Sequence, residues 1–209
     1  AASFTNAIYE QANFDFTVPA GVTECVVMLS GGGGKSQLTN TTGTDAVKGM
    51  VRITGLTPGD VYAYSHGAGN STNTSATTST FMGMTSNSSF TKGSNTITTT
   101  GGTSRTVTKN FIGQHTPAAG ASGSTTTNTS NVTEAGPELT VGFGSLGLDA
   151  ITTGLAGVTN NSGTALNIMD DFDTAFDTNG PLFRPGLSPK SAGNGTQANG
   201  QAGYCLIMY

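Results

Sequence analysis

The chain has 209 residues and a net charge of -4, and only 10% of its residues are charged, against about a quarter in ordinary globular proteins. Eight Lys and Arg residues are too few for the basic stripe that nucleic acid requires, and no apolar run approaches the roughly 20 residues of a membrane span. Gly, Thr, Ser and Asn dominate, and because these residues form helices poorly, the composition predicts an all-β, loop-rich protein.

The first predicted elements are two strands joined by a tight turn. Residues 14–18 alternate between apolar and polar side chains, and Pro19-Ala20-Gly21 is a turn sequence. Residues 24–29 then form a nearly continuous apolar run, which is typical of a buried strand. The N-terminus lacks the basic start and apolar core of a secretory signal, so an exported bacterial surface adhesin is not the favoured class.

Two further strands follow at residues 47–53 and 61–64, with a Pro-Gly turn at 56–60 between them. The apolar run at 204–209 predicts a terminal strand. We therefore expect a single domain over 1–209, built as a small antiparallel sheet or sandwich. Strands in 1–69 and 194–209 would frame a long loop-rich insertion over 70–193, which is rich in Gly, Thr, Ser and Asn.

Two cysteines, Cys25 and Cys205, lie in apolar strand-like runs near opposite ends of the chain. Neither has a second Cys or His at metal-ligand spacing. They are interpreted either as small buried apolar residues or as a disulfide between the first and last strands, since neighbouring strands can bring two cysteines within bridging distance.

The sequence GGGGKS at 31–36 follows the predicted buried strand and has some likeness to a phosphate-binding loop. That loop requires G-x-x-x-x-G-K-[ST]. Gly34 fits the second glycine, but Leu29 stands where the first should be, and the residues after Ser36 show no helical period. The glycines are therefore predicted to allow close backbone packing rather than to bind phosphate.

The run FTVPAGVTECVVMLSGGGGKS resembles the opening of the glycine-rich domain of bacteriophage tail-fibre and receptor-binding proteins. Further likenesses follow in order: LTPGDVYAYSHGAG at 56–69, TFMG at 80–83 and GQAGYCLIMY at 200–209. Together they cover about a third of the chain. Residues 84–193 contain less glycine than the middle of that domain commonly does, which suggests that this Thr/Ser/Asn-rich insertion does the specialised work.

The resemblance implies a non-enzymatic protein on the surface of a virion, acting as a tail-fibre tip or receptor-binding component. Its expected partners are a bacterial surface glycan or outer-membrane protein, other virion or tail proteins, and copies of itself, with a trimer favoured. The alternative is a structural capsid or spike subunit without a receptor-binding role.

Candidate catalytic and metal-binding residues are few. His66 and His115 each stand alone and are interpreted as surface or hydrogen-bonded residues, and the acidic residues Glu134, Glu138 and Asp149 show no pairing typical of a glycosidase. One acidic cluster within DDFDTAFDTNG faintly resembles a calcium loop, although the EF-hand spacing fails; the other interpretation is a solvated turn. The candidate Ca²⁺ ligands are Asp170, Asp171, Asp173 and Asp177.

Overall fold

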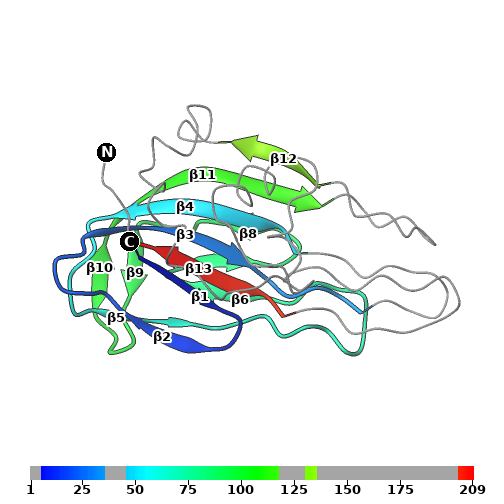
Figure 1. Ribbon diagram of the computed structural model, residues 1–209, viewed down its shortest axis with the longest axis horizontal. Coiled ribbons are helices and arrows are strands. Elements are labelled where there is room, and N and C mark those ends of the chain that lie inside the picture. Colours follow the sequence, from blue (N-terminus) through cyan, green and yellow to red (C-terminus); the bar gives the residue numbers. More distant parts are fainter. Residues whose placement is uncertain (1–5, 36–45, 118–129, 136–201) are drawn as a thin grey trace, which may run out of the picture.

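Six antiparallel strands form the main sheet in the computed structural model, which describes residues 6–35, 46–117, 130–135 and 202–209 (Figure 1). In spatial order these strands are β1 (Ala7–Glu10), β13 (Tyr204–Met208), β3 (Glu24–Ser30), β4 (Lys48–Thr54), β11 (Thr108–Pro117) and β12 (Ser130–Ala135). The C-terminal strand β13 therefore lies between β1 and β3. The predicted all-β class, with N- and C-terminal strands in one sheet, is confirmed.

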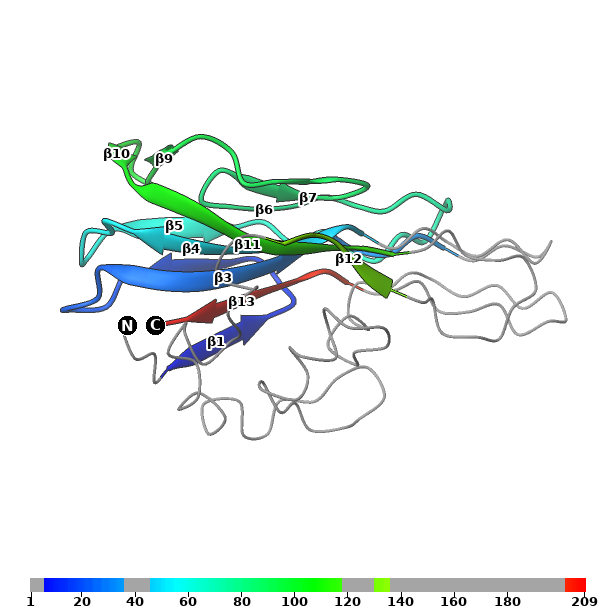
Figure 2. The same ribbon diagram turned by 90° about the horizontal axis from the view of Figure 1, so that it is seen from above.

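Shorter strands make up three small antiparallel sheets. They are the pair β2 (Phe14–Thr17) and β5 (Val61–Tyr64), the meander β6 (Ser79–Phe81), β7 (Met84–Ser86) and β8 (Phe90–Thr91), and the hairpin β9 (Thr96–Thr98) and β10 (Ser104–Thr106). Figure 2 shows β6, β7, β9 and β10 on one side of the main sheet. The arrangement is that of layered antiparallel sheets.

The core lies between these layers. Side chains alternate along a strand, so Cys25, Val27 and Leu29 of β3 share one face, and all three belong to the buried apolar cluster. Phe81 of β6 packs at the centre of an aromatic group, with its ring centroid 6.2 Å from that of Phe16 and 6.5 Å from that of Tyr64. Burial of these rings fixes β2, β5 and β6 against the main sheet.

Both predicted turns are confirmed by their hydrogen bonds. The Val22 amide donates to the Pro19 carbonyl over 3.1 Å, and the Asp60 amide donates to the Thr57 carbonyl over 3.2 Å. In each turn the third position is a glycine with positive φ, 78° at Gly21 and 88° at Gly59. This is the conformation that a type II turn demands and that glycine adopts without steric cost.

The ordered strands extend further into the predicted insertion than the sequence suggested. Strands β6 to β11 all lie within 70–117, and β11 joins the main sheet beside β4. Residues 70–117 of the predicted loop-rich insertion therefore contain strands as well as loops. Strands of two or three residues, rich in Thr and Ser, carry too few apolar positions to show alternation, although Ile97 of β9 is buried.

The two cysteines are free thiols, and both are buried. The disulfide interpretation is wrong for this fold, because Cys205 lies opposite Leu29 in the β13–β3 register. Cys25 is four residues away along β3, or about 13 Å at the rise of a strand, whereas a disulfide requires Cα atoms within about 7 Å. Both cysteines act as small core residues.

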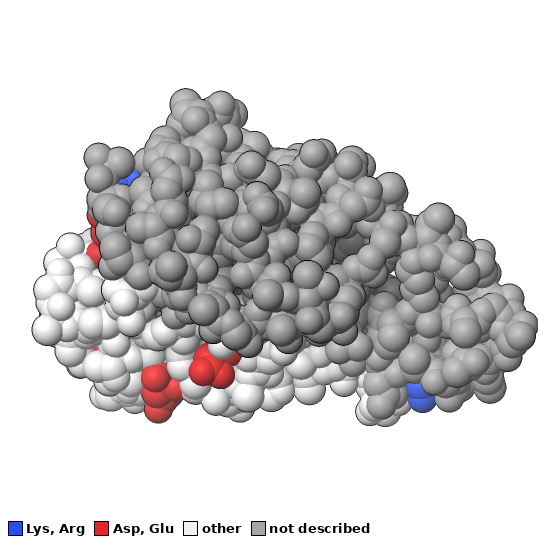
Figure 3. Space-filling model, in the orientation of Figure 1, with Lys and Arg blue, Asp and Glu red and all other residues white. Residues whose placement is uncertain are grey.

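Charged groups are sparse on the described surface. Figure 3 shows a face whose described part is largely uncharged, with few acidic or basic side chains. Two ion pairs occur among the described residues: Arg52 Nη2 lies 2.9 Å from Glu24 Oε2, and Arg105 Nε lies 2.7 Å from Asp60 Oδ2.

Candidate functional site

Backbone amides of the glycine run after β3 donate hydrogen bonds to other parts of the same chain. The Gly31 amide donates to Ser86 Oγ over 2.7 Å, the Gly32 amide to the Thr77 carbonyl over 3.1 Å, and the Lys35 amide to the Asn73 carbonyl over 2.8 Å. A phosphate-binding loop would turn these amides toward the anion. The run therefore does not form such a cradle.

Close packing explains why the run contains glycine. A Cβ atom added to Gly31 would meet the carbonyl oxygens of Thr77 and Ser86, and one added to Gly34 would meet the backbone of Thr74. The prediction that these glycines serve backbone packing is confirmed. The run is therefore part of the scaffold.

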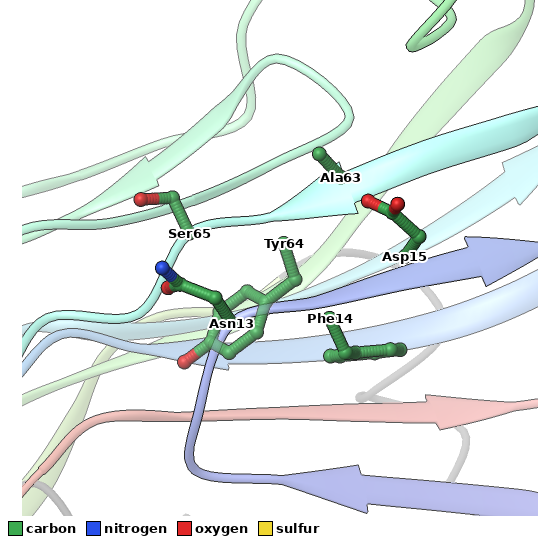
Figure 4. A pocket seen from close by; sticks show the side chains of 6 residues that line it. All are labelled: Asn13, Phe14, Asp15, Ala63, Tyr64 and Ser65. Atoms are coloured by element: carbon green, nitrogen blue, oxygen red, sulfur yellow. The ribbon is translucent and has the colours of Figure 1, made fainter.

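A shallow hollow lies on the β2–β5 ribbon and has a volume of about 350 Å³, within the usual range of small-ligand sites. We call it the Asn13 hollow; its lining residues are Asn13, Phe14, Asp15, Ala63, Tyr64 and Ser65 (Figure 4). They come from two segments about fifty positions apart in the sequence, which the antiparallel pairing of β2 with β5 brings together.

Strand alternation divides the lining of this hollow. Asp15 is paired directly with Ala63 across the ribbon, and Figure 4 shows these two side chains on one side of it and the Phe14 and Tyr64 rings on the other. Asp15, Ala63 and Ser65 are exposed, whereas Tyr64 is buried. The result is a polar outer surface supported from behind by packed rings.

Asn13 is held in place by His66. Its Oδ1 accepts a hydrogen bond from the His66 amide over 2.8 Å and lies 2.7 Å from His66 Nδ1. The Nδ2 amide of Asn13 takes part in neither bond, so it faces away from His66 as a donor. The interpretation of His66 as a hydrogen-bonded residue is confirmed, and its role is to orient Asn13.

A second hollow of about 220 Å³ adjoins the first. We call it the threonine hollow, after the four threonines among its lining residues, which are Tyr62, Ala63, Thr80, Phe81, Met82, Gly83, Thr98, Thr99 and Thr100. Tyr62, Phe81 and Met82 are buried, whereas Thr80 and Thr98 are exposed. The hollow thus combines an apolar base with hydroxyl groups at its surface.

An ion pair holds the start of strand β5, beside this second hollow. Arg105 binds Asp60 with two hydrogen bonds, Nε to Oδ2 at 2.7 Å and Nη2 to Oδ1 at 3.0 Å, and the Tyr62 hydroxyl donates to Oδ2 over 3.3 Å. The hydrogen bonds from Arg105 hold the pKa of Asp60 below its ordinary value. The pair joins the turn before β5 to strand β10.

The predicted metal ligands cannot be placed. Asp170, Asp171, Asp173 and Asp177 lie outside the described residues, as do Glu138 and Asp149. Within the described ranges, no three His, Cys, Asp or Glu side chains gather in a way that could hold a metal ion. His115 lies on β11 and Glu134 on β12. In the part of the chain that the structure describes, no helix is long and apolar enough to span a membrane.

The residues of the two hollows were not predicted from the sequence. The alternation in residues 14–18 does indicate that Asp15 is exposed, since Phe16 and Val18 are buried. Nothing in the sequence indicated that β2 would pair with β5, and that pairing creates the Asn13 hollow. Comparison of the chain with protein-family models found no match, and a search of curated proteins found none either.

Proposed function

We propose that this chain is a receptor-binding component of a bacteriophage tail fibre, and that its Asn13 hollow binds a glycan of the bacterial surface. The observation that carries the proposal is the arrangement of the Asn13, Asp15 and Ser65 side chains around the exposed Ala63 methyl group. The order of motifs along the sequence supports the tail-fibre assignment.

The chemistry of the hollow suits sugar hydroxyls. The Asp15 carboxylate accepts hydrogen bonds, the Asn13 Nδ2 amide donates them, and the Ser65 hydroxyl does both. Ala63 offers a small apolar contact between them. Binding sites of this kind need only a few placed polar groups on a rigid support, and here the packed Phe14 and Tyr64 rings supply that support, with centroids 5.5 Å apart.

In this role the protein belongs on the virion surface. Its partners are the bacterial receptor and neighbouring tail proteins, and the fibre assignment favours a homotrimer. It performs no catalysis, and recognition rests on exposed loops and strand edges.

Replacing Asp15 tests the proposal. We expect Asp15→Ala to weaken binding to lipopolysaccharide or capsular polysaccharide purified from a host that the wild-type protein binds. The loss should be about tenfold or more, because a hydrogen bond to a charged group contributes about 1.5–3 kcal/mol. Isothermal titration calorimetry gives the affinity. Glu10→Ala is the matched control, since it removes a carboxylate from β1, outside both hollows.

Two results would contradict the proposal. Equal binding by Asp15→Ala and the wild type would remove the Asn13 hollow as the glycan site. A protein that binds no bacterial polysaccharide and no intact cells, but assembles into large particles, would instead support the structural capsid or spike subunit.

A further inference from the structure

We propose that the threonine hollow is a second sugar subsite, so that the two hollows together bind adjoining units of one uncharged polysaccharide. This inference rests on the proposed function and specifies its ligand.

The two hollows are continuous across strand β5. Ala63 lines both of them. Ser65 of the Asn13 hollow and Thr80 of the threonine hollow form an isolated bridge, in which each amide donates to the other's carbonyl, over 3.0 and 2.9 Å. The two hollows therefore meet at the exposed Ala63 methyl group, and a chain molecule that follows this line contacts both.

The walls of the second hollow are fixed before any ligand arrives. The Thr100 amide donates to the Val61 carbonyl over 2.9 Å, and the Thr103 amide donates to Thr99 Oγ1 over 3.0 Å. These bonds tie residues 98–100 to β5 and to their own hairpin. A rigid site loses less entropy on binding than one that must order itself.

The lining residues also define the class of sugar. Neither hollow has a Lys or Arg in its lining, and the one charged group among the lining residues is Asp15. A phosphorylated or carboxylated sugar would find no cation in either lining, because the nearby Arg105 is already paired with Asp60, and it would be repelled by Asp15. The exposed hydroxyls of Thr80 and Thr98 donate and accept hydrogen bonds without charge, and the buried rings of Tyr62 and Phe81 give the hollow an apolar base.

The test uses size-graded oligosaccharides cut from an uncharged polysaccharide that binds the wild-type protein. We expect affinity to rise with fragment length until both hollows are filled. The double variant Thr80→Val, Thr98→Val should lose at least about fivefold in affinity for long fragments, because two hydroxyl hydrogen bonds are removed, but bind the shortest fragment normally. Valine favours strands, so the variant should fold. Thr96→Val is the control, an exposed position of β9 outside the hollow.

Each outcome separates the two proposals. If long and short fragments bind alike, and the double variant matches the wild type while Asp15→Ala still weakens binding, the second subsite is wrong and the first stands. If the protein binds only acidic polysaccharides, the inferred ligand class is wrong. If it binds no polysaccharide, both proposals fail.

Discussion

Lys109 is one of two buried lysines among the described residues, with an exposed fraction of 2%; the other is Lys48. Lys109 Nζ donates to the Lys92 carbonyl over 2.8 Å, and Lys92 Nζ donates to the Lys109 carbonyl over 3.1 Å. Burial, and then the nearby charge of Lys92, lower the pKa of Lys109 to about 8. A buried cation is destabilising unless it is well paired, so this side chain links stability to pH.

Stability should rise with pH as the Lys109 ammonium loses its proton. The ordinary pKa of Lys109 is 10.5 and its folded value is about 8. Between these values the unfolded chain holds a proton that the folded chain has released, so the contribution of Lys109 to the free energy of unfolding rises with pH. Urea denaturation should therefore show the wild type gaining stability relative to Lys109→Met between about pH 8 and about pH 10.

Comparison with the variant is needed because other groups act in the opposite direction. Burial raises the pKa of Cys25 to about 12 from 9.0, so its contribution to stability is lost as pH rises above about 9. This loss is common to the wild type and Lys109→Met and cancels in their difference. Parallel stability curves for the two proteins would show that Lys109 keeps its ordinary pKa.

Gly31 carries a second prediction at the residue scale. A Cβ atom there would meet the carbonyl oxygens of Thr77 and Ser86, which are backbone atoms that cannot move aside alone. We expect Gly31→Ala to lower the free energy of unfolding by about 1–3 kcal/mol, the usual cost of overpacking. Gly101→Ala is the control, because an added Cβ there has only Thr99 Oγ1 nearby, at 3.9 Å, and should cost under about 0.5 kcal/mol. Equal stability of the two variants would contradict the packing argument.

At the scale of elements, the sequence predicted those strands that bury apolar side chains. Strands β3 and β13 appear as the runs CVVMLS and YCLIMY because both of their faces are buried, Val27 on one and Met28 on the other. The two turns were also predictable from the sequence, because Gly21 and Gly59 occupy positions that require a positive φ. The short strands β8, β9 and β10 show no such signal, because each carries at most one apolar side chain, such as Ile97 of β9 and Phe90 of β8, which pack in or against the core.

The candidate site depends on long-range strand pairing and register, which a single sequence does not reveal. Asp15 was recognisable as exposed, but its opposite residue Ala63 is set by the register of β2 on β5. Thr80 and Thr98 reach the same hollow from two different small sheets. Residues from distant parts of the sequence are brought together here by long-range strand pairing. In a chain this rich in Thr and Ser, the sequence does not distinguish these threonines from the others.

At the scale of the whole molecule, strands from the two ends of the sequence lie side by side in the main sheet. β13 pairs with β1 on one side and with β3 on the other. The Asn6 amide donates to the Tyr209 carbonyl over 2.9 Å, and the Tyr209 amide returns a bond to the Asn6 carbonyl over 3.0 Å. The last of the described strands in sequence order thus occupies an interior position of the sheet, so the sheet cannot be completed without residues 204–208.

Truncation tests this dependence. Removing residues 204–209 should abolish cooperative thermal unfolding, because the five residues of β13 are fully buried and their loss leaves β1 and β3 without a shared partner. Removing Tyr209 alone is the matched control. It keeps β13 and loses the contact with Phe16, whose ring centroid is 6.0 Å away, so the transition should remain cooperative at a lower temperature. If the longer truncation melts as the wild type does, the main sheet is stable without its C-terminal strand and the predicted dependence on β13 is wrong.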